Sequence, residues 1–443
     1  MAEPLPFALS AYRAVTAAFG PVLAPRMLRR RLAAGKETPG RIAERRGEPG
    51  AARPEGPLVW VHGASVGEFV AALPLVERLC GEGLAVLMTT GTVTSARLAA
   101  ARLPQGALHQ FVPLDMPAFV ARFLDHWRPD LALFVESELW PNTVLTAAAR
   151  RVPLVLVNGR MSARSFSRWR RLPRTIAGLL SRFDLCLVRS RDDAERFAAL
   201  GAPHVRVTGN LKFDVPALPV DPDGLAALLG ATAGRTVVAA ASTHPGEEHA
   251  VVSAHCRIRT SHPDVLTIIA PRHPQRGREV ADVAAAAGLR PALRSAGGLP
   301  DDCDVYVFDT LGELGLVYRI APMVFMGGSL VPHGGQNPIE AIKFGAAILH
   351  GPHVGNFADT YADLGRDGGA VAVAGADALA AHIAAFLGDG ARRDAVAEQG
   401  RRYVESLSGA LGRTLAALET WVAPLRRGSG GGAAAARATS DHA

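Results

Sequence analysis

The sequence predicts an α/β protein with two parallel-sheet domains, and three observations lead to this fold class. Short apolar runs alternate with longer helix-like stretches from residue 57 onward. Three prolines interrupt the alternation over residues 214–223, after which it starts again. Hydrophobic residues make up 49% of the 443-residue chain and charged residues 20%, which is enough apolar material for two cores. Strands that alternate with helices form parallel sheets covered on both faces, so each half is expected to be one such domain.

The expected strands are short apolar runs, each followed by a turn. In the first half they lie over residues 57–62, 84–89, 131–135, 154–158, 185–189 and 205–208. In the second half they lie over residues 236–241, 266–270, 305–308, 323–326 and 346–350. Ligands bind beyond the carboxyl ends of the strands in sheets of this kind. A two-domain protein of this class is therefore expected to bind its substrates in a cleft between the domains.

The composition divides the chain into four segments. Residues 1–46 form an amphipathic and basic segment, residues 47–213 the first domain and residues 214–427 the second. Residues 428–443 are low in complexity and are expected to form a flexible tail.

The N-terminal segment has the pattern of a helix that lies on a membrane surface. Over residues 7–24 apolar side chains recur at helical spacing, among them Leu9, Val15 and Phe19. An arginine-rich stretch follows, and the whole chain carries a net charge of +7. This pattern suits an anionic membrane surface, and it also suits a helix docked on its own domain. No uninterrupted apolar run approaches the ~20 residues that span a bilayer, and no secretory signal is visible, so a soluble or peripheral protein is expected.

The chain has four cysteines, and none of them forms a C-x-x-C pair. Each lies in or near an apolar run, so buried free thiols and a reducing compartment are expected. They are Cys80, Cys186, Cys256 and Cys303.

Two acidic motifs of the first half follow predicted strands. In HGASVGE, Ser65 and Gly67 precede Glu68, which falls in the first turn of a helix. A carboxylate there is suited to act as a general base, or only to complement the helix dipole with its negative charge. In ESELWPN, Glu136 and Glu138 alternate, so only one is expected to face the cleft if the strand continues through them. Paired carboxylates also suit glycoside hydrolysis, which this alternation disfavours.

A basic stretch follows a later strand of the first half. It contains Arg160 and Arg164 and continues to residue 174. Arginine side chains suit phosphate and carboxylate groups, and a solvated cationic helix face is the alternative. No RNA- or DNA-binding motif accompanies the stretch, so nucleic acid is not expected as a partner.

The second half has two groups of turns that suit an anionic ligand. Arg272 and His273 follow one strand, and His244 follows another, with spacing that matches no metal motif. A glycine-rich turn, Gly327–Ser329, has backbone N–H groups that suit a phosphate. In a second such turn, Asn337 is expected to cap a helix, and Glu340 in its first turn suits ribose hydroxyls or a capping role.

Seven stretches, in order across both halves, resemble the bacterial 3-deoxy-D-manno-octulosonate (Kdo) transferases of lipopolysaccharide assembly. They are HGASVGE at 62–68, ESELWPN at 136–142, NGRMSARSF at 158–166, GNLKFD at 209–214, ASTHPGEE at 241–248, PRHP at 271–274 and GGSLVPHGGQNPIEA at 327–341. The resemblance implies a GT-B fold, with two Rossmann-like domains facing a central cleft. It implies inverting transfer of Kdo from CMP-Kdo to a lipid IVA-type acceptor, without a metal or other cofactor. It also implies action at the cytoplasmic face of the bacterial inner membrane.

The resemblance also assigns roles to residues. It implies Glu68 as the general base and Glu136 as a supporting carboxylate. The implied donor contacts are Arg272, His273, Gly327, Gly328, Ser329, Asn337 and Glu340, and the implied acceptor or cleft residues are Ser65, Gly67, Arg160, Arg164 and Lys212. The sequence departs from the family pattern at Gly63, at Val331–His333 and at Ala341. A transferase or epimerase that uses a UDP-sugar, a membrane scaffold and an RNA-binding protein are the alternatives.

Overall fold

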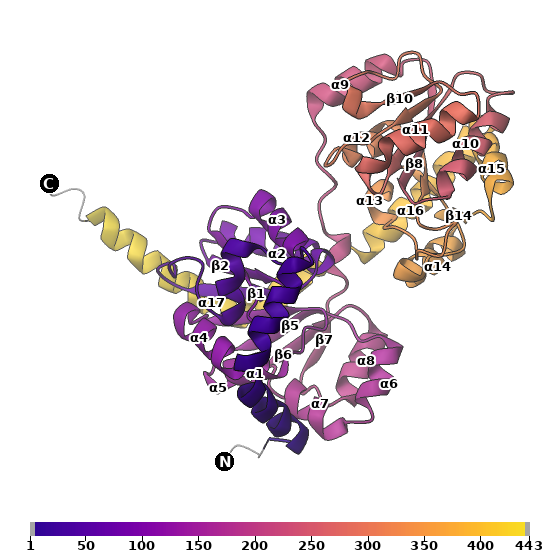
Figure 1. The fold of residues 1–443 in the computed structure, drawn as a ribbon. Helices are drawn as coiled ribbons and strands as arrows, with labels where there is room; N and C mark the ends of the chain where they lie inside the picture. The colour runs from indigo at the N-terminus through magenta and orange to yellow at the C-terminus, as the bar shows by residue number, and fades with distance from the viewer. Residues whose placement is uncertain (1–4, 439–443) are drawn as a thin grey trace. The chain divides into compact units, whose positions relative to one another are not determined.

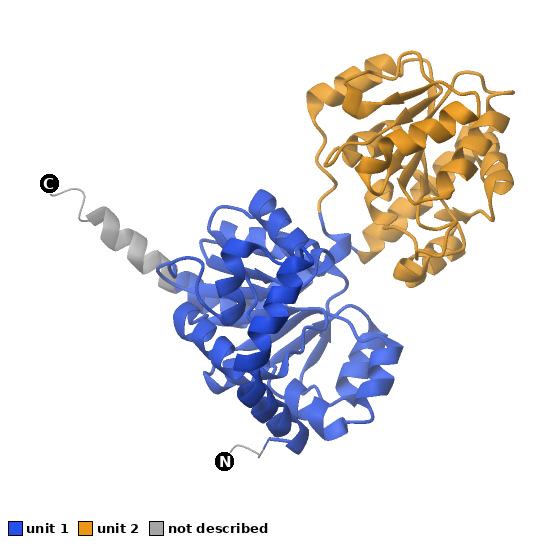
Figure 2. Cartoon of the chain, in the orientation of Figure 1, with its two compact units in different colours: residues 1–215, 408–443 blue, residues 216–407 orange. Residues whose placement is uncertain are grey.

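The computed structural model describes residues 5–438, which fold into two compact units (Figure 2). Unit 1 contains the chain up to Val215 and again from Ser408 onward, and unit 2 contains Pro216–Leu407. Each unit has a seven-stranded sheet in which every neighbouring pair of strands is parallel. The predicted fold class, with two parallel-sheet α/β domains, is confirmed.

The sheet of unit 1 has the strand order β3-β2-β1-β4-β5-β6-β7. Its strands are β1 (Leu58–His62), β2 (Ala85–Thr90), β3 (Ala107–Phe111), β4 (Leu131–Val135), β5 (Leu154–Gly159), β6 (Leu185–Val188) and β7 (Val205–Val207). Its helices are α1 (Phe7–Ala33), α2 (Val66–Gly81), α3 (Val93–Arg102), α4 (Pro117–Trp127), α5 (Pro141–Ala149), α6 (Ala163–Trp169), α7 (Pro173–Leu180), α8 (Arg191–Ala199) and α17 (Ala410–Ala438), with short 3₁₀ helices η1 (Pro39–Arg46) and η2 (Leu211–Phe213). The order reverses between β1 and β4, which makes their carboxyl ends the expected ligand site.

The two faces of this sheet are buried in separate cores. Trp60 of β1 packs on one face with Phe123 and Phe134, whereas its neighbours Val59 and Val61 pack on the other. Successive side chains of a strand point to opposite faces, so a continuous apolar run such as LVWVH is what a strand covered on both sides requires. Each large side chain buried in this way stabilises the fold by roughly 1.5–3 kcal/mol.

The sheet of unit 2 has the strand order β10-β11-β9-β8-β12-β13-β14. Its strands are β8 (Thr236–Thr243), β9 (Val265–Pro271), β10 (Pro291–Leu293), β11 (Val305–Val307), β12 (Met323–Met326), β13 (Ala347–His350) and β14 (Ala370–Ala372). Its helices are α9 (Pro222–Ala231), α10 (Glu247–Ile258), α11 (Gly277–Ala286), α12 (Leu314–Ile320), α13 (Ile339–Ile342), α14 (Ala358–Asp367), α15 (Ala376–Gly388) and α16 (Gly390–Leu407), with 3₁₀ helices η3 (Pro274–Arg276), η4 (Arg294–Ala296) and η5 (Gly355–Phe357). Here the order reverses between β8 and β12, whose carboxyl ends carry the histidine and glycine turns.

The C-terminal part of the chain returns to unit 1, whereas the predicted second domain extended to residue 427. Helix α17 contributes Leu418 and Val422 to the core beside α2. The Asp214 carboxylate accepts the N–H groups of Gly409 and Leu411, which joins the two segments where the chain leaves and re-enters the unit. Of the segment predicted as a tail, residues up to Ala438 fall within the bounds of α17, and residues 439–443 lie outside the described residues.

Helix α1 is longer than predicted, because it continues through Pro21 and Pro25 and includes the arginines that follow. It packs on α4, α5 and α7, and one face buries Leu9 and Leu28 (Figure 1). The other face exposes large apolar side chains, namely Phe7, Tyr12, Val15, Phe19, Val22, Leu23 and Met27. Within residues 5–438, α1 alone is long and apolar enough to cross a bilayer by length and composition, with a mean hydropathy of 1.3. The sequence analysis expected no such segment because it counted only uninterrupted apolar runs.

Candidate active site

The acidic motifs of unit 1 meet at the point where the strand order reverses. Glu68 follows β1, Glu136 and Glu138 follow β4, and both strands end at the same edge of the sheet. Both Glu136 and Glu138 raise the pKa of Glu68 through their negative charges, so all three carboxylates share one site. The expectation that only one of the pair would face the cleft was made for a strand that continues through both, and this condition is not met. Strand β4 ends at Val135, and Glu136 has a φ of 58°, so the alternation of a strand does not extend through the pair.

Glu68 is fixed by a capping box at the start of α2. Its Oε2 accepts the N–H of Ser65 at 2.9 Å, and the Ser65 hydroxyl accepts the N–H of Glu68 at 3.3 Å. Its other carboxylate oxygen, Oε1, has no hydrogen bond to any residue in the described part of the chain. One oxygen therefore caps the helix, as one of the two expectations has it, and the other is left for the general-base role, which stays a prediction.

Burial raises the pKa of Glu68, and the nearby Glu138 and Glu136 raise it further, while the Ser65 N–H opposes this. A carboxylate with a raised pKa is a stronger base than an ordinary one and accepts a proton more readily near neutral pH. The geometry and the electrostatics both suit a general base at this position.

Lys212 balances one of the three negative charges. Its Nζ lies 2.8 Å from Oε1 of Glu136, and η2 holds the lysine at the point where the chain leaves β7. Gly67 lies beside this pair, because a Cβ on it would come within 3.9 Å of the lysine Nζ. Ser65, Gly67, Glu68, Glu136 and Lys212 are thus brought together, as predicted.

Glu138 is the carboxylate that the sequence analysis left without a definite role. Its Oε2 accepts the indole N–H of Trp140 at 2.6 Å and lies 3.3 Å from Nε2 of His62. Thr89 contacts the other side of the His62 ring. The Thr89 hydroxyl accepts the indole N–H of Trp60 and lies 2.9 Å from Nδ1 of His62. The Thr89 carbonyl also lies 3.3 Å from Nδ1, so Thr89 holds the ring with Nε2 directed toward Glu138. Although burial raises the pKa of Glu138, His62 and Trp140 hold it below its usual value.

The basic stretch after β5 is exposed. The side chains of Arg160 and Arg164 lie at the surface, and the carbonyl of Arg160 accepts the hydroxyl of Ser137. None of the arginines from 160 to 174 forms a salt bridge with the residues that the structure describes. They are Arg160, Arg164, Arg168, Arg170, Arg171 and Arg174. The stretch is therefore a cationic surface beside the acidic site, and it lies outside the group of three carboxylates.

In unit 2, the predicted turns lie at the carboxyl ends of three adjacent strands. His244 follows β8, Arg272 and His273 follow β9, and Gly327 follows β12. The N–H of Arg272 donates to the carbonyl of Thr243 at 2.9 Å, which joins two of these turns. The side chains of Arg272 and His273 are exposed at this edge. The sequence analysis placed these groups together correctly.

The glycine-rich turn is not free to bind a phosphate as predicted. The carboxylate of Glu247 accepts the N–H groups of Gly328, Ser329 and Leu330 at 2.6, 2.9 and 2.8 Å. It also accepts the N–H of His244 at 2.9 Å and is 1% exposed. An internal anion thus fills the position that was expected to hold the donor phosphate.

Close packing explains the glycines of this turn. A Cβ on Gly327 would lie 2.4 Å from the carbonyl oxygen of Ser242, and Gly328 has a φ of 66°. Ser329 is fully buried, and its hydroxyl accepts the N–H of Gly351 at 2.8 Å. These residues therefore hold the turn on the end of β8. Sequence reasoning missed Glu247, because an acid in the first turn of a helix gives only the ordinary signal of a capping residue.

Three imidazoles and one guanidinium remain at this edge for an anion. The ring centroids of His244 and His333 are 3.7 Å apart, and those of His244 and His273 are 6.1 Å apart. Burial and the neighbouring His333 lower the pKa of His244. The turn cluster therefore offers one guanidinium, that of Arg272, and three imidazoles that can donate N–H groups.

The second glycine-rich turn leads into α13. The Asn337 side-chain oxygen accepts the N–H of Ile339 at 3.1 Å, and its Nδ2 lies 3.5 Å from Oε1 of Glu340. The helix begins at Ile339, one residue later than predicted, so Pro338 takes the position before it. Glu340 stays in the first turn of the helix and is partly exposed.

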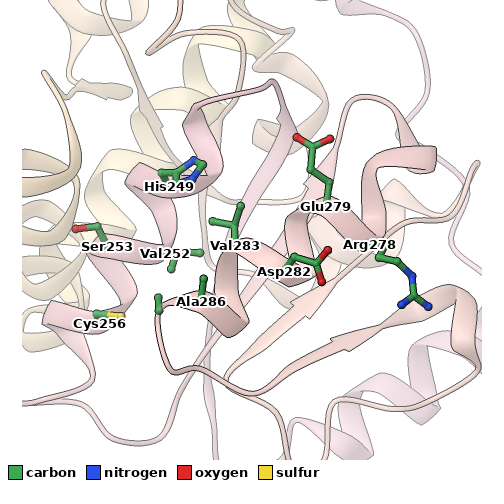
Figure 3. A pocket seen from close by; sticks show the side chains of 10 residues that line it. His249, Val252, Ser253, Cys256, Arg278, Glu279, Asp282, Val283 and Ala286 are labelled. Atoms are coloured by element: carbon green, nitrogen blue, oxygen red, sulfur yellow. The ribbon is translucent and has the colours of Figure 1, made fainter.

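A separate hollow of about 940 Å³ lies between α10 and α11 of unit 2 (Figure 3). Val252 and Val283 line its apolar part, with His249 and Glu279 among its polar side chains. None of the predicted donor residues lines this hollow. The predicted donor residues therefore gather in the turn cluster and not in this groove between helices.

Comparison with known proteins identifies relatives of both halves. Residues 40–215 match the family described as 3-deoxy-D-manno-octulosonic-acid transferase (kdotransferase). The chain is 40% identical over 365 residues to a probable mitochondrial 3-deoxy-D-manno-octulosonic acid transferase of Arabidopsis thaliana, covering 79% of this chain and 81% of the relative. It is 39% identical over 384 residues to 3-deoxy-D-manno-octulosonic acid transferase of Bordetella pertussis, covering 84% and 90%. A solved structure of a putative UDP-N-acetylglucosamine 2-epimerase from Listeria monocytogenes has a TM-score of 0.56 at 15% identity, covering 82% of this chain and 96% of that one.

The two doubly wound units, with turns at their switch points, form the GT-B fold. The extent of the sequence similarity is more specific than the fold. The chain belongs to the 3-deoxy-D-manno-octulosonic acid transferase family.

Proposed function

We propose that this protein transfers Kdo from CMP-Kdo to a lipid IVA-type acceptor in lipopolysaccharide synthesis, with inversion and without a metal. The observation that carries the proposal is the Glu68 carboxylate, held by Ser65 at the switch point with its pKa raised. Family membership supports the transferred sugar, and the chemistry of the turns supports an anionic leaving group. Within residues 5–438, no group of three or more His, Cys, Asp or Glu side chains is arranged to hold a metal ion.

In the proposed reaction, Glu68 takes the proton of the acceptor hydroxyl while the hydroxyl oxygen attacks the anomeric carbon of Kdo. The new C–O bond forms while the bond from that carbon to the phosphate oxygen breaks, and CMP leaves with the electron pair. CMP is a stable anion, so the departing group needs positive charge and not a general acid. Arg272 supplies that charge, the nearby imidazoles can add N–H donors, and Asn337 and Glu340 are assigned to the ribose and base.

Lys212 and the other two carboxylates support the base in this proposal. The 2.8 Å pair between Lys212 and Glu136 limits the negative charge around Glu68, which favours the ionised form that a base requires. The exposed arginines at 160 and 164 are assigned to anionic groups of the acceptor. Their exposure makes them accessible to a large substrate.

The proposed site of action is the cytoplasmic face of the bacterial inner membrane. Helix α1 exposes Phe19 and Val22 at 59% and 58%, and arginines such as Arg26 and Arg29 are exposed on the same helix. A helix with an apolar face and neighbouring arginines binds an anionic bilayer surface by burying the apolar face among the lipids. This arrangement would bring the enzyme to a lipid acceptor.

The test is transfer from freshly generated CMP-Kdo to lipid IVA, followed by mass spectrometry. Wild type is expected to add Kdo-sized mass increments, and Glu68→Gln is expected to add none in the same time. A parallel reaction with a UDP-sugar is the control for donor class. Absence of a mass gain with intact donor and folded wild type would contradict the proposal, as would equal use of the UDP-sugar.

A further inference from the structure

A cavity of about 290 Å³ opens in unit 1 next to the acidic site. Its wall is made by Arg31 at the end of α1, Arg45 of η1, the turns after β1, β2 and β3, and Trp140. A volume of this size holds roughly ten water molecules at ~30 Å³ each, which suits one sugar ring with a phosphate. We propose that this cavity binds a phosphorylated sugar of the acceptor headgroup, with Arg31 contacting the phosphate and Trp140 packing against the ring. The inference rests on the proposed function and assigns part of its acceptor site.

Two wall residues connect the cavity directly to the carboxylates. Ser65 lines it, and the N–H of Ser65 donates to Oε2 of Glu68. Trp140 lines it too, and its indole N–H donates to Oε2 of Glu138. A sugar in the cavity would therefore lie beside the base. The acceptor hydroxyl, on this sugar or on a neighbouring one, has to lie close to Glu68 to lose its proton. A headgroup bound in the cavity meets this requirement.

The guanidinium of Arg31 is the part of the cavity wall that suits an anion. Arg31 and Arg45 share one carboxylate, that of Glu37, at 2.6 and 3.0 Å, so two guanidinium groups face a single negative charge. Arg45 is buried, and its terminal nitrogens donate to the carbonyls of Val112 and Gly91, which fixes it as part of the wall. The side chain of Arg31 is 37% exposed. Its two terminal nitrogens have no hydrogen bond to any described residue, so they are available to a phosphate.

The one acidic side chain in the wall has both of its oxygens engaged in hydrogen bonds within unit 1. Asp115 accepts the hydroxyl of Tyr12, the N–H groups of Asn142 and Thr143, and the hydroxyl of Thr143, at distances from 2.7 to 3.1 Å. Both of its oxygens are therefore occupied. The cavity keeps an excess of donors, which is the property that a phosphate requires.

The position of Arg31 explains why the ligand would be a lipid headgroup and not a free phosphate. Arg31 lies on α1, the helix that exposes Phe19, Val22 and Leu23 over the preceding turns. The same helix reaches the cavity a second time, through the bond from Tyr12 to Asp115. A ligand with a phosphate at Arg31 and acyl chains along α1 would use both features of this helix.

The experiment compares two acceptors in the same mixed micelles, one phosphorylated and one with its phosphates removed. Charged hydrogen bonds contribute about 1.5–3 kcal/mol, so wild type is expected to prefer the phosphorylated acceptor by about tenfold to hundredfold in kcat/KM. Arg31→Gln is expected to lose most of that preference, with the KM for the donor unchanged. Arg30→Gln removes an equal charge from the adjacent exposed residue of α1 and is expected to keep the preference.

A second variant tests the cavity without changing any charge. Val112 lines the cavity and is partly exposed, so Val112→Phe narrows the space, and it is expected to raise the acceptor KM several-fold with the donor KM unchanged. A preference that persists in Arg31→Gln, or that falls equally in Arg30→Gln, would overturn the cavity proposal while the transferase proposal stands. Absence of transfer to either acceptor by wild type would overturn both.

Discussion

The ammonium group of Lys212 lies 2.8 Å from Oε1 of Glu136, within a site that contains two further carboxylates. The lysine comes from η2, the last element before the chain leaves unit 1, whereas Glu136 follows β4 in the middle of the sheet. The strained backbone of Glu136, with its φ of 58°, is what directs this residue out of the alternation of β4. The pair therefore sets the net charge that Glu68 experiences.

Replacing Lys212 with methionine removes the cation and leaves Glu136 unbalanced beside Glu68. Negative charge nearby disfavours ionisation, so the pKa of Glu68, already raised by burial, is expected to rise further. The acid limb of the plot of kcat/KM against pH should move to higher pH. Lys212→Arg keeps the charge and is expected to leave the limb close to its wild-type position. An unchanged limb in Lys212→Met would show that the pair does not act on the base.

Glu68→Gln separates the base from the cap. Glutamine retains an oxygen that accepts the Ser65 N–H, so the start of α2 should persist, but it cannot take a proton. We expect kcat to fall by about 10²- to 10⁴-fold, with a melting temperature close to that of wild type. Glu68→Ala should lose the cap as well, which is expected to lower the unfolding free energy by about 0.5–2 kcal/mol. Its melting temperature should fall accordingly. If Glu68→Gln kept most of its activity, another group would have to be the base.

The raised pKa of Glu68 also predicts how stability depends on pH. A carboxyl group whose pKa is higher in the folded protein contributes stability that is fully present below the unfolded value of 4.5 and is lost as pH rises through the folded pKa. Glu68→Gln does not ionise, so it should gain stability relative to wild type as pH rises through that window. Melting temperatures of the two proteins from pH 4 to pH 8 measure this. A constant difference between them would contradict the prediction.

The sequence alone predicts most of the fold, because the central strands are continuous apolar runs. Strands β4 and β12 were predicted with their observed bounds, and β1 to within one residue. Strand β3 was missed, since it is at the edge of the sheet and carries His109 and Gln110. These two polar side chains bond to Thr90 and Trp127, so their burial depends on partners that are distant in sequence. No local pattern indicates such partners.

The site was predicted to a similar extent, and its errors have the same origin. Residues directly after strands were placed correctly, because parallel strands end at a common edge. The predicted phosphate role of the Gly327–Ser329 turn was wrong. Glu247, more than 80 positions earlier in the chain, already accepts hydrogen bonds from the N–H groups of this turn. Buried N–H groups must have partners, and the sequence does not say whether the partner is a ligand or a side chain such as Glu247.

Glu247→Gln should therefore weaken unit 2 and its donor site together. In the variant, an amide NH₂ group replaces one carboxylate oxygen and faces the N–H groups of Gly328, Ser329, Leu330 or His244. These N–H groups are donors and cannot accept a hydrogen bond from the NH₂ group. We expect a loss of about 3 kcal/mol or more in unfolding free energy and a higher KM for the donor, with the acceptor KM unchanged. Glu279→Gln, at an exposed glutamate of α11, is the matched control and should change neither. A normal donor KM in Glu247→Gln would show that the turn does not shape the donor site.

Substitutions on the exposed face of α1 test how the protein reaches its lipid substrate. Phe19 and Val22 are more than half exposed and lie on the face opposite to Leu28, so replacing both with serine should leave the fold intact. Burial of such side chains contributes roughly 1.5–3 kcal/mol each, so binding to vesicles that contain anionic phospholipid is expected to fall by tenfold or more. Leu229→Ser, at an exposed leucine of α9 in unit 2, controls for a general loss of apolar surface. Equal vesicle binding by the α1 variant and wild type in a flotation assay would mean that the apolar face of α1 does not enter the bilayer, and that any attraction comes from the arginines and is sensitive to salt.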